Sequence, residues 1–286
     1  MSMQLSEIEI QQFLSDAHAE FQSSGFLLEK TLRTQTGVNG AILNFPVFGQ
    51  GIANQKAPQD DVVPLNISNR NVALTLQDWY APEYVDRTFQ YKIAVNAVDE
   101  YVKLCSWALA RRSDQMIIDA ANAVSYSATP ATDLEGGLVP NTLTDGFTYA
   151  KLRAAHKFLR KRSANMGKKY FIIDSEAEAD LLNEDKVTSG FFINDKPIPR
   201  PDGLDGVSIL GMNFIVMPDM TEGGLPAGTA FAWNEMAMGY GSAERLGGDI
   251  TWENIKTSYL VNMWLSANAV AIDPKGMVKV LFTPGD

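Results

Sequence analysis

The longest helical pattern in this chain occupies residues 85–124 and reads VDRTFQYKIAVNAVDEYVKLCSWALARRSDQMIIDAANAV. It contains no proline or glycine, the residues that most often interrupt a helix. Apolar side chains recur along it at helical spacing and define one stripe: Val98, Val102, Cys105, Leu109 and Met116. At about 1.5 Å per residue, a helix from Asn96 to Val124 alone would exceed about 40 Å. We therefore expect one helix that spans the whole molecule, with Cys105 buried on its apolar side.

The segment before this helix has a different character. Residues 41–48 (AILNFPVF) and 72–76 (VALTL) alternate loosely between apolar and polar side chains, as strands do. The residues between them are rich in Gly, Pro, Asn, Gln and Asp. This pattern predicts a two-stranded ribbon with a flexible tip near Lys56–Asp61; the alternative is a disordered loop. An isolated ribbon is not stable in water, so the best candidate for its support is another copy of the chain.

A short amphipathic helix is expected at residues 6–21. Ser6 can cap it, and Glu9 stands at the capping-box position. Apolar side chains again form one stripe: Ile10, Phe13, Leu14, Ala17 and Phe21. An isolated helix of this length is marginal in water, so this segment also needs a surface to pack on.

The second half of the chain predicts a mixture of helices and strands, and hence an α+β fold. We expect one helix from Thr148 to Asn165. A second, short helix is expected to be capped by Asp174 or Ser175 and to end at Asn183, with Glu178 in its capping box. Residues 127–146 read as a turn-rich linker. Strands are expected at residues 169–173, 207–209, 212–217, 230–238, 258–271 and 277–282, with a turn at Gly211.

Catalytic and metal-binding patterns are absent from the sequence. It contains two histidines, His18 and His156, and neither has a cysteine or carboxylate at metal-ligand spacing. There is no phosphate-binding loop or nucleophile elbow, and Gly239-Tyr-Gly241 lacks the third glycine of a dinucleotide site and is expected to be a turn. We therefore expect no catalytic residue, cofactor or metal. No apolar run reaches the roughly 20 residues that span a bilayer, so we expect no membrane partner.

The charge of the chain is acidic, with 24 Lys and Arg against 34 Asp and Glu and a net charge of -10. Nucleic-acid binding usually requires a basic face. The one concentration of positive charge lies on the helix predicted after Thr148: Lys151, Arg153, Lys157, Arg160, Lys161 and Arg162. A nucleic-acid helix is one interpretation. We favour a solvated or intersubunit ion-pairing face, because the same helix has an apolar stripe and acids dominate elsewhere.

Several stretches resemble the major capsid proteins of tailed bacteriophages, which have the Hong Kong 97-type capsid fold. RNVALTLQDWYAPEYVDRTFQYKIAVNAVDEYVKLCSWALARRSDQMIIDAANAV (residues 70–124) is similar to the family's run from an extended loop into a long spine helix. FTYAKLRAAHKFL and KKYFIIDSEAEADLL (147–159 and 168–182) resemble the helix, strand and helix of its axial domain. VSILGMNFIVMPDM (207–220) resembles its hairpin, and AVAIDPKGMVKVLF (269–282) its return strand into the peripheral domain.

The resemblance implies five segments: an N-terminal arm (1–34), an extended β loop (35–80), a peripheral domain with the spine helix (81–145), a mixed axial domain (146–270) and a return strand to the peripheral domain (271–286). The arm and the loop would lie over neighbouring subunits. The contacts implied between subunits are Phe13, Phe21, Phe45, Phe48, Lys56, Val72, Leu74, Arg111 and Arg112. Some members join subunits by a Lys–Asn isopeptide bond. Lys56 with Asn262 or Asn268 would be the pair here, although no local motif matches.

The function implied is that of a structural major capsid protein. Its hexamers and pentamers would form an icosahedral shell that encloses DNA without sequence-specific binding, assembled in the host cytoplasm and present in the virion. Scaffolding, portal and decoration proteins are the further partners implied. The alternatives are an encapsulin-like compartment shell, a tail or connector component, and an acidic cytoplasmic α+β enzyme that uses carboxylates such as Asp174 or Glu235.

Overall fold

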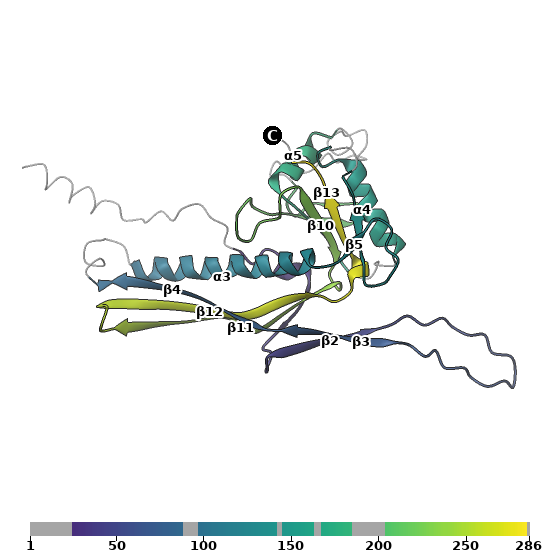
Figure 1. The fold of residues 1–286 in the computed structure, drawn as a ribbon, viewed down its shortest axis with the longest axis horizontal. Coiled ribbons are helices and arrows are strands. Elements are labelled where there is room, and N and C mark those ends of the chain that lie inside the picture. Colours follow the sequence, from purple (N-terminus) through teal and green to yellow (C-terminus); the bar gives the residue numbers. More distant parts are fainter. Residues whose placement is uncertain (1–24, 88–96, 142–144, 163–166, 185–203, 285–286) are drawn as a thin grey trace, which may run out of the picture.

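The computed structural model describes residues 25–87, 97–141, 145–162, 167–184 and 204–284. The molecule is elongated (Figure 1). Helix α3 (Ala97–Asn122) lies along a sheet of long strands, and a second body with its own sheet stands at one end of that helix. A two-stranded ribbon extends from the subunit below this second body. The three parts correspond to three sheets of four, seven and two strands.

The four-stranded sheet supports the long helix. Its order is β1 (Arg33–Thr36), β11 (Met238–Glu253), β12 (Ser258–Ala271) and β4 (Gln77–Asp86). Alternate residues of its strands face α3, and Cys105 of the helix is buried there with Val85 and Val261. Burial raises the pKa of the Cys105 thiol, and the charge of Glu83 adds to this effect. The predicted long helix is confirmed from Ala97 to Asn122, although it runs along the long sheet and not across the whole molecule, and the buried position of Cys105 is confirmed.

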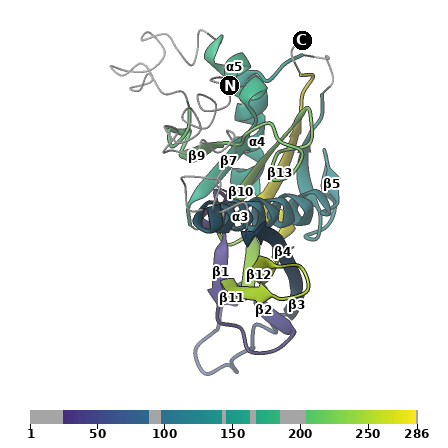
Figure 2. The same ribbon diagram turned by 90° about the vertical axis from the view of Figure 1, so that its left-hand side faces the viewer.

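The seven-stranded sheet forms the second body. Its order is β5 (Tyr126–Ser127), β6 (Gly136–Val139), β13 (Met277–Leu281), β10 (Thr229–Asn234), β7 (Lys169–Ile173), β9 (Met212–Val216) and β8 (Ser208–Ile209). Its two faces carry separate cores. Phe171 belongs to a core with α4 (Tyr149–Lys161) and α5 (Ser175–Leu182), whereas its neighbour Ile172 packs with residues of α3. In an end-on view α3 lies between this body and the long sheet (Figure 2).

The ribbon consists of β2 (Ile42–Phe48) and β3 (Asn69–Thr75), which pair in antiparallel register. Its base has a small core within the subunit, formed by Leu43, Phe45, Leu74 and Ile272. Gly239 of β11 makes room for it, since a Cβ there would lie 2.7 Å from the Phe45 ring. The predicted ribbon is confirmed, and its base packs on its own chain.

The segment boundaries predicted from the resemblance do not coincide with the sheets. Strand β4 begins at Gln77, inside the predicted loop, and continues to Asp86, so Val85 is extended and not helical. β11 and most of β12 fall within the predicted axial segment 146–270, yet both strands belong to the long sheet. β13, expected to return to the peripheral domain, pairs on one side with β6 of the predicted peripheral segment 81–145 and on the other with β10 of the predicted axial segment. Apolar patterning indicates that a strand is buried without indicating which sheet it joins.

Local signals explain several element ends. Asp174 caps α5 by accepting a hydrogen bond from the Ala177 N–H at 2.8 Å. Glu178 does not close the predicted capping box, because its carboxylate accepts the Leu204 N–H instead. Gly211 has φ +73 at the turn between β8 and β9, as predicted. Short 3-10 turns occur at η1 (Glu29–Thr31) and η2 (Pro274–Gly276), and the helix predicted at residues 6–21 lies outside the described part of the chain.

Candidate assembly surfaces

The outer part of the ribbon carries a concentration of exposed apolar side chains. Its last ladder bond runs from the Gly49 N–H to the Ser68 carbonyl at 2.8 Å, and residues 50–67 form the tip. The exposed apolar side chains of this region are Phe48, Ile52, Val62, Val63, Leu65 and Ile67. Phe48 is 74% exposed and Ile52 86% exposed. Apolar side chains on an extended element are typical of a surface that a partner covers.

The predicted contact residues of the ribbon divide into two groups. Phe48 and Lys56 are exposed, and Val72 is half-buried. Phe45 and Leu74 are buried in the ribbon's own base, at 0% and 2% exposure. The assignment of Phe45 and Leu74 as intersubunit contacts is therefore corrected: their side chains hold the ribbon to its own subunit. Phe13 and Phe21 lie outside the described residues.

Arg112, another predicted contact, is used within the subunit. Its guanidinium carbon lies 3.9 Å from the centre of the Trp79 ring, which joins α3 to β4. It also forms an ion pair with Glu222 at 3.8 Å. A cation over an indole contributes about 0.5–2 kcal/mol. We therefore reassign Arg112 as a clamp between elements of one chain, whereas Arg111 is half-buried beside it, with its backbone against Gly223.

The chain enters the described structure at a fixed point on α3. The Asp114 carboxylate accepts hydrogen bonds from the backbone N–H groups of Leu27 and Leu28 at 3.1 and 3.0 Å. Trp233 donates its indole N–H to the Thr31 hydroxyl at 3.1 Å. Burial raises the pKa of Asp114 to about 6, although both backbone hydrogen bonds oppose this shift. The described chain therefore begins against the second half of the spine helix.

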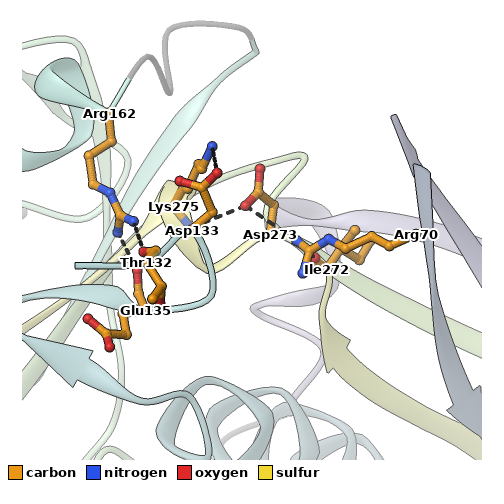
Figure 3. A network of polar contacts seen from close by, with 8 residues as sticks. All are labelled: Arg70, Thr132, Asp133, Glu135, Arg162, Ile272, Asp273 and Lys275. Atoms are coloured by element: carbon orange, nitrogen blue, oxygen red, sulfur yellow. Dashed lines mark hydrogen bonds and ion pairs between the residues drawn. The ribbon is translucent and has the colours of Figure 1, made fainter. Parts of the chain in front are cut away.

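A chain of polar contacts joins the ribbon to the second body (Figure 3). Arg70 of β3 donates a hydrogen bond to the Ile272 carbonyl at 2.9 Å and lies 3.6 Å from the Asp273 carboxylate. Lys275 of the same turn lies 2.6 Å from the Asp133 carboxylate. Arg162, directly after α4, donates hydrogen bonds to the carbonyls of Thr132 and Glu135, on either side of Asp133 in the sequence. The base of the ribbon is thereby attached to the seven-stranded body as well as to the long sheet.

The two carboxylates named for the enzyme alternative do not meet. Asp174 follows the last residue of β7, whereas the Glu235 N–H bonds to the Lys168 carbonyl just before the first residue of that strand. In the described ranges no group of three or more His, Cys, Asp or Glu side chains is arranged to hold a metal ion. None of the described helices is long and apolar enough to cross a membrane.

The proposed cross-linking residues are also placed. Lys56 is exposed at the ribbon tip, whereas Asn268 lies at the ribbon base and donates its amide to the Thr75 carbonyl at 2.8 Å. Within one subunit the two therefore lie at opposite ends of the ribbon, and an isopeptide bond between them would have to join different copies. Asn262 is half-buried on β12.

Comparisons with known proteins agree with this architecture. The family described as phage capsid protein matches residues 5–284. The fold is similar to the capsid of cyanophage P-SCSP1u, with a TM-score of 0.70 and 14% identity over 96% of this chain and 92% of that chain. It is also similar to the capsid of Ralstonia phage GP4 (TM-score 0.68, 10% identity, 95% and 94% covered) and to a structure of Mycobacterium phage Che8 (0.66, 14%, 93% and 94%). No curated protein sequence matches the chain. The expected Hong Kong 97-type fold is confirmed.

Proposed function

The chain belongs to the phage capsid protein family, and we propose on this premise that it is the major capsid protein, whose copies close into an icosahedral shell around DNA. Its role is structural and not catalytic. Hexamers and pentamers would be the building units, assembled in the host cytoplasm and retained in the virion. Scaffolding, portal and decoration proteins would be further partners.

The observation that carries this proposal is the contrast between the two ends of the ribbon. The base is fixed by buried Phe45 and Leu74, whereas Phe48 and the tip leave apolar side chains in solvent. A neighbouring subunit would cover them. Burying one Val, Ile or Phe side chain contributes about 1.5–3 kcal/mol, and association costs offset part of this. One ribbon contact would therefore be reversible, while the many contacts of a closed shell would be stable together.

The acidic charge fits a container for DNA. With a net charge of -10 the subunit repels phosphate as a whole, so DNA would be enclosed without being bound tightly. We therefore expect DNA, and not a cargo enzyme, as the content of the particles formed during infection.

Replacing the ribbon tip tests the proposal. Residues 50–67 would be replaced by Asn-Gly between Gly49 and Ser68, whose hydrogen bond already closes the ladder. This deletion keeps Phe45 and Leu74, so we expect a folded subunit by circular dichroism. Negative-stain microscopy should show closed, uniform particles for the unmodified chain and none for the variant.

A second pair of variants separates apolar contact from tip length. Ile52→Ser, Val62→Ser and Val63→Ser together keep the length and should reduce particle yield. The matched control, Gln55→Ser with Asp60→Asn and Asp61→Asn, changes three polar tip residues and should assemble. An unmodified chain that stays monomeric at high concentration, with or without a scaffold, would overturn the proposed function.

A further inference from the structure

Helix α4 presents a positively charged face. Residues 149–162 contain six Lys and Arg and no acidic residue. The apolar stripe of the helix, Leu152, Ala155 and Leu159, is buried against the seven-stranded sheet. Four cations on its other side are exposed: Arg153, Lys157, Arg160 and Lys161. They are spaced at i, i+4, i+7 and i+8 and therefore share one face.

The described part of the subunit does not neutralise these four side chains. The other two cations are occupied, since Lys151 donates to Asn141 and to the carbonyls of Asp145 and Gly146, and Arg162 donates to a nearby loop. Among the described residues, none of the four exposed cations forms an ion pair. Like charges four residues apart on a helix destabilise it, so counter-charge from outside would stabilise this face.

Burial and the positive charge of this face lower the pKa values of two neighbouring side chains. His156 lies on the same helix, and its pKa is lowered by burial and further by the charges of Arg160 and Lys169. Lys169 is affected in the same direction, by burial and by Arg160. The positive potential therefore extends from α4 onto the adjoining start of β7.

An acidic surface occupies the other part of the same body. Residues 170–184 and 204–222 contain eight acidic residues and no Lys or Arg; of the eight, Asp174 is buried and Glu222 is paired with Arg112. Glu176, Asp205 and Asp219 are exposed close to the ends of β7 and β9. Burial raises the pKa of Asp174, and the charges of Asp219 and Glu176 raise it further.

The two charged surfaces lie over different halves of the sheet. Helix α4 packs against β6 and β13, on one side of the central strand β10. The acidic residues flank β7 and β9 on the other side of β10, and Figure 2 shows β9 and β5 on opposite flanks of the body. A two-fold pairing of α4 with α4 would bring like charges together. A head-to-tail contact would bring the basic face against the acidic surface, as in a ring of copies.

We propose that the basic face of α4 docks on the acidic surface near the ends of β7 and β9 of the next copy, within one ring of subunits. This rests on the proposed shell function. The contact would determine how neighbouring copies are oriented in the ring, and it would weaken as the salt concentration rises. Nucleic acid is the less favoured occupant, because the acidic surface of the same body repels phosphate.

A charge swap tests the contact. The basic variant is Arg153→Glu with Lys157→Glu, the acidic variant is Glu176→Lys with Asp205→Lys, and the third carries all four changes. Each single-surface variant should lower the yield of closed particles at least about tenfold at low salt, because like charges then meet. The variant with all four substitutions should recover most of the yield of closed particles. The control, Arg153→Lys with Lys157→Arg, keeps the charge and should assemble normally.

The remaining outcomes are distinguishable. If the unmodified chain forms no particles, the proposed function fails first. If it assembles and the folded single-surface variants assemble equally well, the docking contact is wrong and the shell function stands. If circular dichroism shows that every variant is folded and the variant with all four substitutions still gives few particles, the pairing of these two surfaces is also wrong. Intact particles of the basic variant with less co-purifying nucleic acid would assign α4 to nucleic acid instead.

Discussion

The Asp114 carboxylate accepts a hydrogen bond from the backbone N–H of Leu28 at 3.0 Å, across 86 positions of sequence. The bond attaches the chain at Leu28 to the second half of the spine helix. Asp114 is 1% exposed, and the buried charge of its ionised form is held mainly by backbone N–H groups. Burial, with a smaller contribution from the charge of Glu29, raises its pKa to about 6.

Acid should therefore stabilise the folded subunit, because protonation of Asp114 removes a buried charge. Because the folded pKa of Asp114 lies above the ordinary value of 3.8, the folded subunit binds more protons than the unfolded chain between these values. The stability that Asp114 contributes is present at low pH and is lost as pH rises through about 6. Between pH 4.5 and 7.5 the loss for this group is about 2 kcal/mol.

Urea unfolding of the unassembled subunit across that range measures the effect. Asp114→Asn should remove about 2 kcal/mol of the pH dependence of the unfolding free energy. Asp119→Asn, an exposed position on the same helix, is the control and should keep the profile of the unmodified chain. Parallel profiles for the Asp114 variant and the unmodified chain would show that this carboxyl is not the group that titrates.

Gly25 should tolerate no side chain. It has φ +69, and a Cβ there would lie 2.3 Å from the Ala110 carbonyl carbon. Gly37 has nearly the same backbone, φ +71, but open space around it. Gly37→Ala should cost about 1–2 kcal/mol of unfolding free energy from backbone strain alone, and Gly25→Ala about 1–3 kcal/mol more from the clash. Equal losses for the two variants in urea unfolding would contradict the close packing of Gly25 on α3.

Much of this fold could be predicted because its signals are local. The spine helix follows from the 3.6-residue spacing of its apolar side chains, and α5 begins where Asp174 can cap it. The ribbon follows from two β-like stretches separated by turn residues. Each of these signals lies within the element that it predicts, so no knowledge of distant neighbours was required.

The misses have the opposite origin. Gly239-Tyr-Gly241 was expected to be a turn, yet it lies inside the long strand β11, where the glycines make room for Phe45 and Leu43 of the ribbon. β6 lies within the predicted linker 127–146 and is held by pairing with distant β13. β5, which ends at Ser127, pairs with β6. The contact of Asp114 could have been predicted from the sequence. A carboxylate next to the apolar stripe of a buried helix needs hydrogen-bond donors, and here backbone N–H groups supply them.

Phe45 and Phe48 lie three residues apart on the same strand and should behave differently. Phe45 is fully buried, so Phe45→Ala should cost about 3–5 kcal/mol of unfolding free energy. Phe48 is 74% exposed, so Phe48→Ala should change stability by less than about 0.5 kcal/mol but lower particle yield. Urea unfolding and negative-stain particle counts on the same preparations separate the two effects. A Phe48 variant that assembles normally would remove this residue from the proposed contact.

Arg70 should fix the direction of the ribbon more than the stability of the subunit. Its side chain is 36% exposed, and its links to Asp273 and the Ile272 carbonyl should contribute about 1 kcal/mol or less. A small rotation at the base displaces the distant tip by a large distance. Arg70→Ala should therefore broaden the distribution of distances between two spin labels, one at the ribbon tip and one on α3. The labels would be attached at Lys56→Cys and Lys103→Cys in a Cys105→Ala background. Asn71→Ala, an exposed change at the adjacent position, should leave it narrow. An unchanged distribution for Arg70→Ala would mean that the buried base alone orients the ribbon.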